Sequence, residues 1–426
     1  MLPIVNVGRK SLVDYATIAA RGLMEEIQRL AEPLAGKRVL HLSATAFGGG
    51  VAEINYTLVP LMGDAGLEVE WRIIQGAEEF FDVTKRIHNG LQGAPEALTE
   101  EQKEAFVRYQ RLNAEQLEND YDFVIVHDPQ PAGIIDFFDS PQGQWIWRCH
   151  IDLSTPNPDV LGFLLPSIRR HDAAIFHLEK YVPAADGLPP CFIWPPAIDP
   201  LAPKNMALSA EDAAYIVDQF GVDVERPLFV QVSRFDPWKD PLGVIDAYRL
   251  VKERFPEIQL ALVGSMAHDD PEGWDYYNRT VAHAHGDPDI FILSNLNNVG
   301  SVEVNAFQVH SQAVIQKSIR EGFGLTVSEA LWKARPTVGG RVGGIVVQIE
   351  DGVTGWLVDS PGQCAQACIE IVRDPRTARE RALRGKEHVR RHYLMPRLLR
   401  DWLALFNRLS GNDTADVELV TVAATG

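Results

Sequence analysis

The sequence predicts an α/β protein of two domains, each built on a parallel β-sheet. Its 426 residues exceed the length that one hydrophobic core usually serves, which favours two domains of roughly 200 residues each. Short apolar runs alternate with helix-length amphipathic segments, the pattern of parallel strands connected by helices. A proline-rich stretch in the middle of the chain separates two series of such runs. We therefore expect two stacked α/β domains.

Apolar runs of strand length occur in both halves of the chain. The first half contains residues 37–43 (KRVLHLS), 122–127 (DFVIVH) and 173–177 (AAIFH). The second half contains residues 228–233 (LFVQVS), 259–264 (QLALVG) and 313–316 (AVIQ). Ligands of open α/β sheets bind at the carboxyl ends of the strands. The residues that directly follow these runs are therefore the candidates for function.

The domain boundary is predicted near Ile198. Residues 194–204 (WPPAIDPLAPK) contain four prolines, which forbid a helix and stiffen an extended linker. The first domain is expected over 1–197 and the second over 198–390. Helical segments near the C-terminus include one within 391–410 that can cross back to the first domain. Residues 411–426 are expected to form a flexible tail.

The composition excludes several classes of protein. A formal charge of −18 argues against a broad surface for nucleic acid or for anionic membranes, because phosphates need clustered Lys and Arg. No apolar stretch approaches the roughly 20 residues of a membrane span, and the N-terminus lacks the pattern of a signal peptide. We therefore expect a cytoplasmic protein whose ligands are small molecules.

A glycine-rich turn follows the first strand. Gly48, Gly49 and Gly50 precede a helical pattern that begins at residue 51. Glycines let the backbone approach an anion closely, and the following helix offers free N–H groups and its positive dipole end. The same glycines are equally compatible with a purely structural tight turn. Taken alone, this turn leaves both interpretations open.

The first strand of the second half runs into a loop with two cations. Residues 233–241 (SRFDPWKDP) place Arg234 and Lys239 close together in sequence. Arg grips phosphate oxygens with a fork of donors and Lys adds a point charge, which suits a diphosphate group. The alternative is a surface loop in which both cations pair with Asp236 and Asp240.

The strongest motif is residues 321–329 (EGFGLTVSE), at the start of a predicted helix. Gly322 and Gly324 expose backbone amides there, beside Phe323 and Leu325. The flanking carboxylates of Glu321 and Glu329 can accept hydrogen bonds from a ligand rich in hydroxyls. The alternative, an ordinary helix start with a solvated second glutamate, explains less of the pattern.

The second-half motifs resemble the donor site of glycosyltransferase family 4, and the similarity covers most of the chain. In that family the Arg and Lys hold the diphosphate, the first Glu bonds sugar hydroxyls and the second Glu bonds the ribose. The resemblance assigns these roles to Arg234, Lys239, Glu321 and Glu329. It implies the GT-B fold, in which two Rossmann-like parallel-sheet domains face a central cleft. The N-terminal domain would be the acceptor side, and the C-terminal domain would bind the nucleotide-sugar.

A narrower resemblance lies in the first half. Four segments are similar to the trehalose-forming branch of this family: residues 43–53 (SATAFGGGVAE), 81–93 (FDVTKRIHNGLQG), 127–131 (HDPQP) and 147–152 (WRCHID). In the wider family a His at the place of His150 touches the donor sugar near the reacting centre. The alternative for His150 is a purely structural role, as a core histidine whose hydrogen bonds are satisfied. Further candidates for holding substrate hydroxyls are Asp128, Gln130, Arg148 and Asp152.

The resemblance implies a retaining glucosyltransferase that makes α,α-trehalose from a nucleotide-diphosphate glucose and glucose. The alternatives are a retaining trehalose phosphorylase, a sugar-nucleotide epimerase and, outside catalysis, a sugar- or nucleotide-binding module. A homodimer is expected by resemblance. The Asp-x-Asp pairs at residues 120–122 and 287–289 precede strands, opposite the ligand edge, so they are interpreted as turn residues. No metal and no cofactor is expected to be required.

Overall fold

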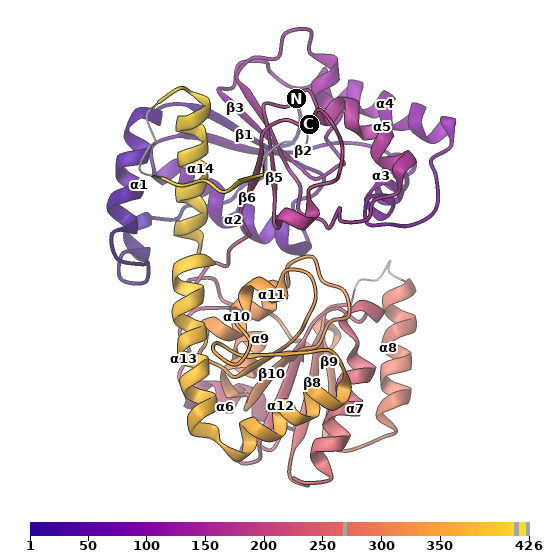
Figure 1. Ribbon diagram of the computed structural model, residues 1–426, viewed down its shortest axis with the longest axis vertical. Coiled ribbons are helices and arrows are strands. Elements are labelled where there is room, and N and C mark those ends of the chain that lie inside the picture. The colour runs from indigo at the N-terminus through magenta and orange to yellow at the C-terminus, as the bar shows by residue number, and fades with distance from the viewer. Residues whose placement is uncertain (267–270, 413–416, 423–426) are drawn as a thin grey trace. The chain divides into compact units, whose positions relative to one another are not determined.

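The computed structural model of the chain describes residues 1–266, 271–412 and 417–422. The chain folds into two compact units. Unit 1 comprises Met1–Pro196 and Met395–Gly426, and unit 2 comprises Ala197–Leu394. The division passes through the proline-rich segment, where the sequence places the boundary near Ile198. Each unit contains a mainly parallel sheet with helices packed against it (Figure 1).

The sheet of unit 1 has the strand order β13-β6-β5-β4-β3-β1-β2. All neighbouring strands are parallel except β13, which is antiparallel to β6. Strands β1, β3, β4 and β5 are almost continuously buried, because helices cover a parallel sheet on its faces. Their bounds are β1 Arg38–Ser43, β2 Glu68–Ile73, β3 Phe123–His127, β4 Gln144–Arg148, β5 Ala173–Phe176, β6 Cys191–Ile193 and β13 Thr421–Val422.

The helices of unit 1 include one from the far end of the chain. Helix α14 packs beside α1, and Asn407 of α14 donates a hydrogen bond from Nδ2 to the carbonyl of Leu30 at 2.8 Å (Figure 1). The bounds are α1 Leu23–Ala31, α2 Gly49–Asp64, α3 Glu78–Leu91, α4 Glu100–Ala114, α5 Pro158–Ile168 and α14 Met395–Leu409, with 3₁₀ turns at Leu12–Tyr15, Glu32–Leu34, Ile134–Phe137 and Glu179–Tyr181.

The C-terminal tail differs in part from the expectation for residues 411–426. Thr421 and Val422 form β13 and pair with Phe192 and Cys191 of β6. The backbone of residues 421–422 is held by hydrogen bonds to β6, which would otherwise be an open edge of the sheet. The expectation for residues 413–416 and 423–426 lies outside the described residues.

The sheet of unit 2 has the strand order β12-β11-β10-β7-β8-β9, with all pairs parallel. The strands are β7 Leu228–Val232, β8 Gln259–Gly264, β9 Ile290–Ser294, β10 Ala313–Gln316, β11 Thr337–Gly340 and β12 Trp356–Val358. The helices are α6 Ala210–Asp218, α7 Pro241–Lys252, α8 Pro271–Ala284, α9 Ser301–His310, α10 Leu325–Trp332, α11 Ile345–Gln348, α12 Pro361–Arg373 and α13 Pro375–His392, with 3₁₀ turns at Pro237–Lys239 and Asn295–Asn297.

Local sequence signals explain where several of these helices begin. Helices α7, α12 and α13 each start with a proline, preceded by a residue whose side chain accepts a backbone N–H of the first turn. These caps satisfy donors that a helix start leaves without partners. Within the described ranges, no helix is long and apolar enough to span a bilayer.

The two Asp-x-Asp pairs lie beside basic side chains, and both precede strands as expected. Lys252 forms ion pairs with Asp287 and Asp289, at 2.8 Å to each. Lys37 pairs with Asp122 at 2.7 Å, and Arg38 pairs with Asp120. The carboxylates are thereby engaged in holding turns before β9 and β3.

Candidate active site

In unit 2, the loop after β7 meets the loop after β10, where Lys239 pairs with Glu321 and Lys317 pairs with Asp240. Nζ of Lys239 lies 2.6 Å from Oε2 of Glu321, and the two side chains are only 16% and 8% exposed. The hydroxyl of Ser318 donates to the same carboxylate oxygen at 3.1 Å. A carboxylate held by a cation and a hydroxyl keeps one orientation. The pair expected from sequence to hold diphosphate and sugar is therefore preassembled around Glu321.

The helix start at α10 depends on Gly324. This residue caps α10 with φ of 82°, in the left-handed region that favours glycine. The amide of Gln348 donates to the carbonyls of Phe323 at 2.6 Å and Gly324 at 3.3 Å. Gln348 is in turn held by the hydroxyl of Ser328 at 2.6 Å. These contacts hold the backbone that precedes Leu325, so that the first-turn amides of α10 have a defined direction.

The second glutamate of the motif is almost fully buried. Glu329 is 2% exposed, and Nζ of Lys204 lies 3.4 Å from its Oε1. Lys333 follows directly after α10, and its Nζ donates to the backbone carbonyl of Glu329 at 3.3 Å. Burial is the main cause that lowers the pKa of Lys333 to about 7; the charge of Glu329 opposes this shift and that of Lys204 adds to it. Lys204 was not singled out from sequence.

Arg234 behaves differently from Lys239. Its side chain is 70% exposed, and its guanidinium lies 3.3 Å from Oδ2 of Asp236. Asp236 also accepts the backbone N–H of Lys239 at 3.1 Å and so shapes the turn. Because exposed ion pairs are weak, Arg234 is free to exchange this partner for a stronger anion such as a diphosphate.

In unit 1, the glycine turn lies at the start of α2. Gly48 caps the helix with φ of 73°, and Gly49 begins it with φ of 77°. A Cβ at either position would meet no atom within 4 Å, so backbone conformation rather than crowding favours glycine. Gly48 and Gly49 are exposed and Gly50 is half-buried. Their surroundings leave room for a ligand at the helix N-terminus.

A row of histidines crosses the carboxyl edge of the unit 1 sheet. His41 of β1, His127 of β3 and His150 after β4 stack with ring centroids 5.3 and 5.2 Å apart. His177 after β5 meets His150 edge-on at 5.4 Å. Adjacent strands therefore place four imidazoles side by side. Sequence reasoning singled out His150 and missed the others, although His127 and His177 each end an apolar run and His41 lies within one.

The other residues expected to bind substrate are used largely within unit 1. Asp128 accepts the backbone N–H of His150 at 2.7 Å, and Asp152 accepts that of Ser154 at 2.8 Å. The backbone carbonyl of Gln130 accepts a hydrogen bond from Gln110, and its side chain is half-buried. Arg148 is more deeply buried than these three side chains.

Arg148 was expected to hold an acceptor hydroxyl, but it is only 2% exposed. Its Nη2 donates to the carbonyl of Trp194 at 3.1 Å, and its guanidinium lies 5.9 Å from the centroid of the Trp194 ring. Burial and the nearby charge of Arg397 lower the pKa of Arg148 to about 9. The contacts of Arg148 thus lie within unit 1, and its assignment to a substrate hydroxyl stays a prediction.

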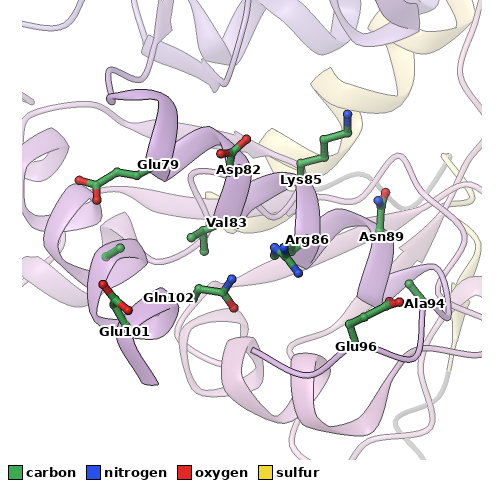
Figure 2. A pocket seen from close by; sticks show the side chains of 11 residues that line it. Glu79, Asp82, Val83, Lys85, Arg86, Asn89, Ala94, Glu96, Glu101 and Gln102 are labelled. Carbon is green, nitrogen blue, oxygen red and sulfur yellow. The ribbon is translucent and has the colours of Figure 1, made fainter. Parts of the chain in front are cut away.

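A surface cavity of about 660 Å³ lies between α3 and α4, away from these residues. Figure 2 shows Glu79, Asp82 and Lys85 along α3, with Glu101 and Gln102 of α4 below them. Its lining has no aromatic side chain and contains none of the candidate site residues. Within the described part of the chain, no group of three or more His, Cys, Asp or Glu is arranged to hold a metal ion.

Two family models match the chain, one in each half. Residues 41–183 match the model described as trehalose synthase, N-terminal domain, and residues 214–388 match that of glycosyl transferases group 1. The trehalose synthase of Rubrobacter xylanophilus is 60% identical over 417 residues, covering 96% of this chain and 100% of that protein. The chain belongs to the trehalose synthase family.

Membership of the trehalose synthase family makes the chain a glycosyltransferase and confirms the family resemblance seen in the motifs. The trehalose phosphorylase of Pleurotus pulmonarius is more distant, at 29% identity over 82% of this chain and 54% of that protein. Among solved structures, a UDP-forming α,α-trehalose-phosphate synthase from Burkholderia xenovorans in complex with glucose-6-phosphate superposes with a TM-score of 0.68. It shares 16% identity and covers 88% of this chain and all of that chain. This likeness confirms the predicted GT-B fold for the trehalose synthase family member described here.

Proposed function

We propose that this enzyme is a retaining glucosyltransferase that makes α,α-trehalose from a nucleotide-diphosphate glucose and free glucose, reversibly. The buried contact between Lys239 and Glu321, beside the amides at the start of α10, carries this proposal. It joins a phosphate-binding cation to a sugar-binding carboxylate within one unit. The 60% identity to a trehalose synthase over the full length of that protein supports the choice of acceptor.

The proposed reaction exchanges one bond at the anomeric carbon for another. The bond from C1 of glucose to the diphosphate oxygen breaks, and its electron pair leaves with the nucleotide diphosphate. A hydroxyl of the acceptor glucose forms the new bond on the same face, and its proton passes to the leaving phosphate. The product is α-linked, and both atoms and charge balance.

Within unit 2, stabilisation of the leaving phosphate is assigned to Arg234, Lys239 and the amides near Gly324. Preorganised donors of this kind each contribute about 2.7–4 kcal/mol to a transition state. Glu329 is assigned to the ribose and Glu321 to the hydroxyls of the donor sugar. No metal enters this scheme, since the cationic side chains and amides meet the developing charge.

In this scheme Glu321 positions the sugar and does not attack it. Its carboxylate already accepts from Ser318 and contacts Lys239, which holds it as a hydrogen-bond acceptor. Replacing Glu321 with Ala should reduce turnover strongly without trapping a glycosyl-enzyme. Mass spectrometry of the enzyme during turnover tests this, and a covalent adduct on Glu321 would contradict the assignment.

Product formation followed by NMR tests the proposal as a whole. The purified protein is incubated with UDP-, ADP- and GDP-glucose plus glucose, with and without phosphate and EDTA. We expect α,α-trehalose without added phosphate and with EDTA present. Trehalose formed only from glucose 1-phosphate would make the enzyme a phosphorylase. Tight donor binding without any product would make the chain a binding module.

A further inference from the structure

The histidine row in unit 1 is joined by ring nitrogens as well as by stacking. Nδ1 of His41 lies 3.0 Å from Nε2 of His127, and Nδ1 of His127 lies 2.9 Å from Nε2 of His150. His41 and His127 are 0% and 2% exposed, while His150 is half-buried. The row therefore leads from the interior of the unit to a side chain that reaches its surface.

The three joined rings are neutral under ordinary conditions. Burial lowers the pKa of His41 to about 3 and holds the pKa values of His127 and His150 well below their ordinary range. The positive charge of Arg148 acts in the same direction on His127 and His150. A neutral imidazole has one N–H donor and one acceptor nitrogen. Each nitrogen–nitrogen contact must therefore contain one proton.

Only two proton arrangements satisfy both contacts. If His127 carries its proton on Nδ1, it donates to His150 and accepts from His41, so His150 carries its own proton on Nδ1. If His127 carries its proton on Nε2, it donates to Nδ1 of His41 and accepts from His150. In that case His150 carries its proton on Nε2. Because His127 takes part in both contacts, its tautomer decides which nitrogen of His150 is a donor.

The surroundings of His127 favour the first arrangement. The amide Nδ2 of Asn55, which only donates, lies 3.5 Å from Nε2 of His127 and so favours an acceptor there. In the second arrangement His41 carries its proton on Nε2, and that proton would face Sδ of Met62, which lies 3.4 Å from Nε2. A thioether is a weak acceptor, so it does little to draw a proton to that end of the row.

We propose that His127, held by His41 and Asn55, is a positioning residue that fixes His150 as the tautomer protonated on Nδ1. Nε2 of His150 is occupied by His127, and Nδ1 has no protein partner among the described residues. His150 thus presents an N–H donor, suited to a sugar hydroxyl oxygen. The inference deepens the proposed function, because His150 is the side chain that the family resemblance places beside the donor sugar.

The tautomer of His150 is measured directly by long-range ¹H–¹⁵N correlation NMR on protein labelled at histidine nitrogens. The His150→Gln variant assigns the signals by difference. We expect a protonated Nδ1 and an unprotonated Nε2 in His150. A proton on Nε2 of His150 would overturn the inference while leaving the proposed function intact.

Variants of His127 separate positioning from packing. In His127→Asn the amide group takes the place of the Nδ1–H donor, whereas His127→Leu removes it. We expect His127→Asn to keep the His150 tautomer and kcat/KM within threefold, and His127→Leu to lose at least tenfold in kcat/KM. His171→Leu is the matched control, because His171 is buried in the same unit but lies outside the row. It should leave kcat/KM within twofold.

These measurements test the positioning role of His127 and the place of His150 in the proposed catalytic site separately. Equal activity of His127→Asn and His127→Leu would contradict the positioning role. If His127→Leu fails to fold, the positioning role is still tested by the His150 tautomer in the unchanged protein and by the activity of His127→Asn. Full activity of His150→Ala would remove His150 from the proposed catalytic site, whatever its tautomer.

Discussion

At the scale of single residues, burial changes what the charged side chains of this enzyme do. Asp128 lies in the left-handed region with φ of 64°, between the strand end at His127 and the loop that contains His150. Burial raises its pKa to about 7, although the backbone N–H of His150 and the charge of Arg148 oppose the shift. The native protein therefore holds a proton on Asp128 that the unfolded chain releases near pH 4.

Asp128→Asn should stabilise the protein at pH 8 and leave it nearly unchanged at pH 4. Between about pH 4 and 7 the native carboxyl stays protonated while the unfolded one ionises, so stability falls as pH rises. The raised pKa corresponds to at most about 4 kcal/mol, and we expect a gain of about 1–3 kcal/mol above pH 7. Asn keeps the acceptor for His150 and tolerates the left-handed backbone. Urea unfolding at pH 4 and pH 8 measures the difference.

The exposed Asp139 provides the control for this experiment. Asp139→Asn should change the urea midpoint by the same small amount at both pH values. A gain for Asp128→Asn that did not depend on pH would show that the stabilisation has another origin than the carboxyl proton.

Lys239→Met tests the buried pair with Glu321. Removing one partner leaves the Glu321 carboxylate buried without its cation, which typically costs about 3–5 kcal/mol in stability. Loss of a charge-stabilising donor should also lower kcat by roughly 10²–10³-fold. Lys103→Met breaks an exposed pair with Glu100 and should cost at most about 0.5 kcal/mol with unchanged kcat. Unchanged turnover in Lys239→Met would exclude Lys239 from the leaving-group site.

At the scale of elements, helix α10 shows how one residue links backbone conformation to the site. Gly324 caps the start of the helix with φ of 82°, and a Cβ there would lie 3.1 Å from Cγ of Glu321. Gly22 caps α1 with φ of 81°, but a Cβ there would meet no atom within 4 Å. A side chain at either position would thus strain the backbone to a similar degree, but only a side chain at Gly324 would press against Glu321.

Gly324→Ala and Gly22→Ala should therefore have similar stability and different activity. Each forces alanine into the left-handed region, at about 1–3 kcal/mol. Only Gly324→Ala moves the Glu321 carboxylate, and a small misplacement of a catalytic group lowers turnover by roughly ten- to a hundredfold. Thermal unfolding and steady-state kinetics of both variants measure this. Equal activity of the two would mean that Glu321 tolerates displacement.

At the scale of the whole molecule, the chain leaves unit 1 after Pro196 and returns to it at Met395. The returning helix α14 completes the core of unit 1. Phe406 stacks on Phe123 of β3 with ring centroids 4.1 Å apart, and Trp402 meets Trp194 edge-on at 5.6 Å. Arg397 donates to the carbonyls of Pro195 and Pro196 at 2.9 and 3.0 Å, which ties the helix to the end of the first segment.

Truncation after Leu394 should therefore unfold unit 1 or make the protein aggregate. It removes Trp402, Leu403 and Phe406, each at most 2% exposed, and burial of such a side chain contributes about 1.5–3 kcal/mol. Of the described residues, truncation after Asn412 removes 417–422, which include the short β13 and the buried Val417, and it should lower the melting temperature by a few degrees at most. Circular dichroism and size-exclusion chromatography of both proteins compare them. A soluble, cooperatively melting protein ending at Leu394 would contradict this account of α14.

The α/β class, the strands at the apolar runs and the two loops that contain Lys239, Glu321 and Gly324 could all be predicted from the amino-acid sequence. These features are local, because strand burial, helix capping and glycine conformation depend on neighbouring residues. The histidine row, the burial of Arg148 and the contact between Lys204 and Glu329 became visible only in the folded chain. Each of these joins side chains that are distant in sequence, and no local pattern states which strands are neighbours in a sheet. Pairing and burial decide whether a polar side chain faces a ligand, positions another residue or remains in the core.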